Sequence, residues 1–146
     1  MTAKKAKKPE PHAEGVVFGT GKRKKAVARA MGKPWTGKIT INGTPLAVLN
    51  DMFLRMRIEE PMLLVGAPAK GFDFRVTVHG GGPVSQSEAS RMAIARCLVQ
   101  QLGDEVKRSF VAYDRNLLIP DPRRTETHKP PHSSWGARRY KQRSKR

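Results

Sequence analysis

Residues 72–103 read FDFRVTVHGGGPVSQSEASRMAIARCLVQQLG, and this stretch decides the class of fold. Its first eight residues alternate between apolar and polar side chains, a period of two that predicts a strand with its apolar face buried. After three glycines, apolar residues recur at spacings of three and four, at Met92, Ala95, Val99 and Leu102. This spacing, with further apolar residues on other faces, predicts a helix that lies against a sheet.

Single residues predict both ends of this helix. Ser85 and Glu88 have the spacing of a capping box, in which two side chains bond the first free backbone N–H groups. Gly103 stands where a glycine commonly ends a helix.

The flanking segments supply further strands and helices. Alternation predicts strands at 25–31 and 38–42, and the second of them runs into a turn at Asn42-Gly43. Residues 45–60 have helical spacing, and Pro61 should break or restart that helix because it has no N–H to donate.

A short helix from Asp104 and a last strand at 116–119 complete the order. Strands and helices in this order predict a two-layer α/β sandwich, with one mixed sheet and helices packed on one face.

The charge of the chain points to a polyanionic partner. The 146 residues include 29 Lys and Arg against 12 Asp and Glu, a formal net charge of +17. Nucleic acid or an anionic membrane surface would offset this self-repulsion. The membrane is disfavoured because the longest apolar run, at 62–69, is too short to span a bilayer and the N-terminus does not resemble a signal peptide. Cys97 is the only cysteine of the chain. It is expected to be buried, and a single cysteine fits a reducing cytosol.

Composition divides the chain into three parts. Residues 1–14 are expected to be a disordered basic arm, residues 15–120 a globular domain, and residues 121–146 an extended basic tail. The tail carries nine basic and two acidic side chains, and its apolar residues are too few to bury a core.

Three stretches imitate enzyme or metal motifs without completing them. Residues 32–39 have P-loop spacing, but Ile39 replaces the metal-binding hydroxyl residue, and we interpret the stretch as a β-hairpin connection. Residues 79–82 resemble an oxyanion loop, but the chain has no matching nucleophile motif. Pro130 and Pro131 separate His128 from His132, which argues against a metal site. We expect no catalytic role, no metal and no cofactor.

A basic cluster at 22–25 follows Gly19-Thr20-Gly21, which is expected to break the chain between two strands. Cations on a flexible backbone suit a phosphate-binding lip that contacts RNA without reading bases. A solvated loop or a localisation signal is an equal alternative.

Several motifs then occur in a fixed order: GTGKRKKAVARA, INGTPL, EEPMLLVG, VTVHGGG, QSEASRMAIARCLV, YDRNLLIPDPRR and a final SKR. With these motifs the chain resembles the family of the ninth small-subunit ribosomal protein, and YDRNLLIPDPRRTE is closer to its archaeal branch.

The resemblance implies the ribosomal α/β fold, a place on the cytoplasmic ribosome, and no enzymatic activity. Its partners would be the 3′ major domain of the small-subunit rRNA in the head, neighbouring head proteins, and the peptidyl-site tRNA, which the C-terminal tail would approach. Free nucleic-acid binding of the chromatin type, and less plausibly a phosphotransferase activity, are the alternatives.

These arguments together give the candidate site residues. The residues expected to bind RNA are Lys22, Arg23, Lys24, Lys25, Arg29, Gly80, Gly81, Gly82, Arg123, Arg124, Arg138, Arg139, Lys141 and Arg143. The residues expected to reach the tRNA are Ser144, Lys145 and Arg146. Trp135 and Tyr140 could stack on bases or pack against neighbouring protein.

Overall fold

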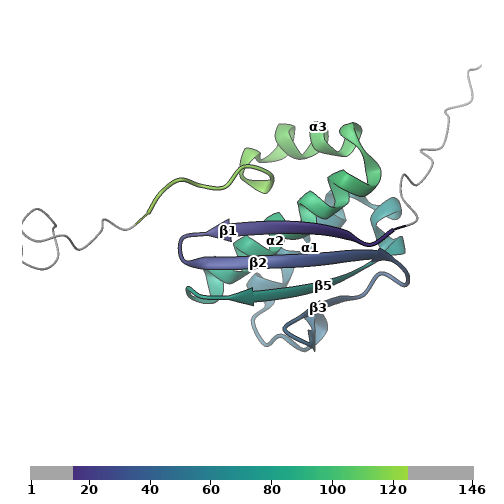
Figure 1. Cartoon of the computed structure of the whole chain (residues 1–146). Coiled ribbons are helices and arrows are strands. Elements are labelled where there is room, and N and C mark those ends of the chain that lie inside the picture. Colours follow the sequence, from purple (N-terminus) through teal and green to yellow (C-terminus); the bar gives the residue numbers. More distant parts are fainter. Residues whose placement is uncertain (1–14, 125–146) are drawn as a thin grey trace, which may run out of the picture.

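A computed structural model of the chain describes residues 15–124. The predictions for the arm at 1–14 and for the tail residues Arg138, Arg139, Lys141 and Arg143 to Arg146 lie outside these residues, as do those for Trp135 and Tyr140. Helices cover one face of a single sheet, and the other face is open (Figure 1). This arrangement confirms the predicted two-layer α/β sandwich.

The sheet has five strands in the order β1-β2-β5-β3-β4. The strands are β1 (Val17–Arg23), β2 (Ala26–Pro34), β3 (Ile39–Ile41), β4 (Thr44–Pro45) and β5 (Phe72–His79). β5 pairs antiparallel with β2 and parallel with β3, so the sheet is mixed, as predicted.

Three α-helices lie against this sheet and one another: α1 (Met52–Val65), α2 (Pro83–Leu102) and α3 (Asp104–Tyr113). Short 3₁₀ turns are η1 (Leu46–Val48), η2 (Ala67–Gly71) and η3 (Arg115–Leu117). α2 packs across β1, β2 and β5 and forms the centre of the core. Its residues Ala93, Ile94, Ala95 and Leu98 have no exposed surface.

The two strongest sequence patterns are confirmed. In β5, Phe72, Phe74, Val76 and Val78 face the helices and are buried, while the residues between them face the open side. Gly103 ends α2 with a positive φ of 87°, and its N–H donates to the Val99 carbonyl. Asn42 and Gly43 both have positive φ, as their turn requires.

Cys97 is buried, as expected. Burial raises the pKa of its thiol to about 11, so the side chain is neutral.

The predicted break at Gly19-Thr20-Gly21 is wrong, because β1 runs through all three residues. A Cβ on Gly19 would lie 2.2 Å from the Ala93 carbonyl oxygen, and one on Gly21 would lie 1.9 Å from that of Ala89. These glycines therefore allow the backbone of α2 to contact the strand. Their role is to let α2 lie close to β1, and they do not make the strand flexible.

The predicted β-hairpin connection at 32–39 is also wrong. β2 and β3 do not pair with each other, because β5 lies between them. The connection instead packs beside the start of β5, where the Trp35 N–H donates to the Gly71 carbonyl at 2.8 Å.

Three local predictions fail where tertiary contacts override a local pattern. α2 begins at Pro83 and not at the capping box, and Glu88 forms an ion pair with Arg23. Pro61 does not break α1, which continues to Val65 with the Pro61 ring buried. Residues 116–119 form no strand, because the Asp114 carboxylate accepts from the Asn116 N–H and starts η3.

Candidate nucleic-acid interface

The β1–β2 hairpin carries the basic cluster, which we name the hairpin lip (Lys22, Arg23, Lys24 and Lys25). Lys24 takes a positive φ of 50° at the turn. The three lysines are exposed, but the Arg23 side chain is only 17% exposed because it faces the helices. The lip therefore presents three cations to solvent, and its fourth has a structural role.

The glycine loop at 80–82 lies directly against the hairpin lip. A Cβ on Gly80 would lie 2.5 Å from the Lys25 carbonyl oxygen, and one on Gly81 would lie 3.1 Å from the Ala26 nitrogen. Gly80 and Gly81 both have positive φ, which glycine adopts without strain. The fold thus brings together two stretches that the sequence separates by more than fifty residues.

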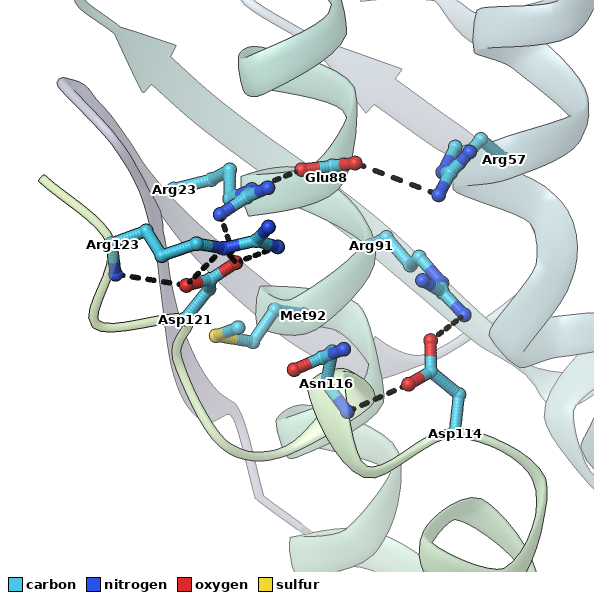
Figure 2. Close-up of a pocket in the computed structure, with 9 residues that line it drawn as sticks. All are labelled: Arg23, Arg57, Glu88, Arg91, Met92, Asp114, Asn116, Asp121 and Arg123. Carbon is cyan, nitrogen blue, oxygen red and sulfur yellow. Dashed lines mark hydrogen bonds and ion pairs between the residues drawn. The ribbon is translucent and has the colours of Figure 1, made fainter.

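The segment at the end of the described chain also reaches the lip. Arg23 forms ion pairs with Glu88 of α2 and with Asp121 (Figure 2). The Arg124 guanidinium donates to the Lys24 carbonyl. Residues 121–124 are thereby fixed beside the hairpin, and the exposed Arg123 and Arg124 add two cations to its surface.

Asp121 is the acceptor that holds this segment. Its carboxylate accepts from the Arg123 side chain at 2.6 Å and from the Arg123 backbone N–H at 2.8 Å, and it pairs with Arg23 (Figure 2). The hydrogen bond from the Arg123 side chain, then that from its backbone, hold the pKa of Asp121 well below its ordinary value. Asp121 is thus ionised at neutral pH.

This low pKa predicts an acid-sensitive contribution to stability. Because the folded-state pKa is depressed, the contribution is full above the unfolded pKa of about 3.9 and is lost as pH falls through the folded value. We expect the stability of the native chain to fall more steeply between pH 5 and pH 2 than that of Asp121→Asn. Urea unfolding at several pH values checks this, and parallel curves for the two proteins would contradict it.

Arg29 does not join the hairpin lip. It lies on β2 between Thr20 of β1 and Thr77 of β5, exposed on the open face of the sheet. The predicted RNA-binding residues among 15–124 therefore occupy two places: the lip with its glycine loop and Arg123–Arg124, and the open face.

Sequence reasoning missed two arginines of α2 that fix the segment at 114–121. Arg91, 6% exposed, pairs with Glu60 at 2.6 Å and with Asp114 at 2.9 Å. Arg96 donates to the Leu118 carbonyl at 2.7 Å and to the Thr20 carbonyl at 2.6 Å. Two arginines within the apolar stretch at 89–99 of this helix were a usable clue, since buried charges are almost always paired.

A cavity of about 190 Å³ lies among these ion pairs. Its four arginines are Arg23, Arg57, Arg91 and Arg123, and Figure 2 shows Glu88, Asp114 and Asp121 among them. The carboxylates already pair with the arginines. The cavity is thus the interior of a structural network.

Between residues 15 and 124, no three His, Cys, Asp or Glu side chains are grouped as a metal ion would need. In the same part of the chain, no helix combines the length and apolar character needed to cross a membrane.

Comparisons with known proteins give one consistent result. A family model described as "Ribosomal protein S9/S16" matches residues 21–146. The chain is 44% identical over 132 residues to the small ribosomal subunit protein uS9 of Methanococcus maripaludis, covering 90% of this chain and 98% of that protein. It is 48% identical over 135 residues to the uS9 protein of Desulfurococcus amylolyticus, covering 90% of this chain and 93% of that protein.

Proposed function

The chain belongs to the ribosomal protein S9/S16 family, and from this premise we propose that it binds small-subunit rRNA in the head, within the 3′ major domain. The resemblance noted from the sequence motifs, including its archaeal character, is confirmed. The family is one of structural proteins of the small ribosomal subunit. The observation that carries the proposal is the family match, which spans both the domain and the tail.

The hairpin lip suits contacts to RNA phosphates. Lys22, Lys24 and Lys25 are exposed, and Arg123 and Arg124 lie beside them. Lysine and arginine are the side chains that neutralise phosphates and release their counterions. The neighbouring backbone at 80–82 adds N–H groups that an RNA phosphate could accept from. We propose that this surface positions the protein on rRNA without reading bases.

We further propose that the tail contacts the peptidyl-site tRNA, while neighbouring head proteins and rRNA line its path. The support is its composition and length. Residues 121–146 carry nine cations, and 26 residues in an extended path span about 80 Å, at about 3.3 Å per residue. Asp121 fixes the start of this segment on the domain. The final Ser144, Lys145 and Arg146 combine a hydroxyl, a point charge and a planar guanidinium, all able to bind phosphate oxygens.

Deletion of Ser144 to Arg146 tests the tRNA contact. We expect subunit assembly to be unchanged and peptidyl-site tRNA binding to weaken by about 1–2 kcal/mol, the scale of lost charged hydrogen bonds. The measurement is tRNA binding to purified small subunits that carry the shortened chain, at two salt concentrations.

A matched control is Lys107→Ala with Arg108→Ala, which removes two exposed cations from α3. This variant should bind tRNA as the native chain does. Native affinity of the shortened chain at both salt concentrations would contradict the tRNA contact.

A further inference from the structure

No helix covers the open face of the sheet (Figure 1). Residues that alternate along β1, β2 and β5 place their side chains on this face. Strand pairing aligns them in rows across β1, β2 and β5. The rows are Lys22–Val27–His79, Thr20–Arg29–Thr77 and Phe18–Met31–Arg75. Lys33 lies beyond the last row, opposite Asp73. This surface meets the hairpin lip at Lys22 and extends from there across the face of the sheet that lies opposite α2.

The charge of this face is almost entirely positive. Lys22, Arg29, Lys33 and Arg75 are exposed, and Asp73 is the only carboxylate that any of the five strands carries. Asp73 Oδ1 accepts from the Lys38 N–H at 2.9 Å and from the Thr36 N–H at 3.0 Å. These hydrogen bonds hold the carboxylate against the connection after β2, and its single negative charge leaves the four cations in excess. A polyanion is the partner that complements this face.

Two aromatic side chains on this face have no partner that buries them. Phe18 is 66% exposed and lies beside Met31, its cross-strand neighbour. Trp35 is 68% exposed, and the Lys33 ammonium lies 5.1 Å from its ring centre. An exposed aromatic ring costs free energy in water, and a base that stacks on the ring removes that cost. A duplex hides its base faces, so these rings favour unpaired nucleotides.

We propose that the open face of the sheet binds an unpaired RNA segment, with Phe18 and Trp35 stacking on bases and Arg29, Lys33 and Arg75 binding phosphates. Thr20 and Thr77, exposed on either side of Arg29, supply hydroxyls that bond phosphate or ribose oxygens. The inference rests on the proposed function, since both take RNA as the ligand. It extends the RNA contacts from the lip onto the open face, and it assigns Phe18, Lys33, Trp35 and Arg75, which sequence reasoning did not single out.

Trp35 is a reporter for this surface. The chain has two tryptophans, so Trp135→Phe leaves the emission of Trp35 alone. The full chain with this substitution is titrated with a single-stranded RNA of twelve nucleotides and, separately, with a blunt RNA duplex of twelve pairs. We expect the single strand to quench the emission of Trp35 to saturation. The duplex should quench it weakly or not at all.

Paired variants in the same background then locate the contact. Phe18→Ala with Arg75→Ala removes one exposed apolar group and one cation from the open face. Val111→Ala with Arg108→Ala removes the same two kinds of group from α3. We expect the first variant to raise the half-saturating concentration of single-stranded RNA by about tenfold or more, because one base stack alone accounts for about that factor. The second should change it less than about twofold. Circular dichroism confirms that both variants fold.

The anisotropy of labelled RNA, recorded in the same titrations, separates this inference from the proposed function. RNA that binds without any change in the emission of Trp35 would overturn the open-face site and leave the hairpin lip and the tail as the binding surfaces. Equal weakening by the two variants would also overturn it. If the RNA does not bind at all, the proposed function fails together with the inference.

Discussion

Gly21→Ala is expected to destabilise the native state more than any other substitution considered for this chain. The added Cβ would lie 1.9 Å from the Ala89 carbonyl oxygen and 2.8 Å from the Ala93 nitrogen. Both are backbone atoms of α2, so no side-chain rotation relieves the clash, and helix and strand must separate. Overpacking in a core costs about 1–3 kcal/mol where side chains can adjust. Displacing the central helix should cost more, about 4 kcal/mol or above.

The measurement is urea unfolding followed by circular dichroism, with Gly71→Ala as the matched control. A Cβ on Gly71 meets no atom within 4 Å, and the residue is exposed. The control should change the free energy of unfolding by less than about 0.5 kcal/mol, as surface substitutions usually do. If the two variants unfold at the same urea concentration, the close contact between β1 and α2 is not required.

Arg91→Met is expected to cost about 3 kcal/mol of folding stability. Arg91 is 6% exposed on α2 and joins Glu60 of α1 to Asp114 at the end of α3. Its Nε–H is not aligned with an acceptor, so the pairing with Glu60 depends mainly on charge. Removing one partner of a buried ion pair costs about 3–5 kcal/mol. The two carboxylates are 24% and 29% exposed and regain some water, which places the expectation at the lower end of that range.

The control is Arg57→Met, on the neighbouring helix. Arg57 is 48% exposed and lies 3.5 Å from Glu88, an arrangement worth about 0–1 kcal/mol. Methionine keeps a long apolar side chain in both variants, so the comparison isolates the charge. Equal stabilities of the two variants in urea would show that the buried network contributes no more than a surface pair.

The same network fixes residues 114–121 against α2 and β1. Arg91, Arg96 and Arg23 bind Asp114, Leu118 and Asp121 in that order along the chain. Each contact joins the segment to α2 or to the end of β1, and the last lies at the hairpin lip. The lip and residues 121–124 are therefore parts of one basic surface.

The class of fold could be predicted because its elements repeat their pattern several times. β5 has four apolar residues at a period of two, and all four are buried. α2 has an apolar stripe at spacings of three and four with further apolar residues on other faces, and such a helix is buried against a sheet. Gly103 and the Asn42-Gly43 turn were predictable because these positions need a positive φ, which few residue types adopt readily. The basic surface was predictable in its chemistry, since the excess of cations is a property of composition.

The tertiary structure alone decided what single residues do within those elements. The sequence around Gly21 does not reveal whether this glycine bends a loop or allows a helix to approach the strand. Its role depends on the contact with Ala89, which is distant along the chain. Arg23 stands among three lysines, yet Glu88 and Asp121 turn it from a surface cation into a structural one. The open face became visible only when strand pairing placed Phe18 beside Met31 and Arg75. A sequence pattern reports which side of a segment avoids water, whereas the packing partner of that side is fixed by the free energy of the whole fold.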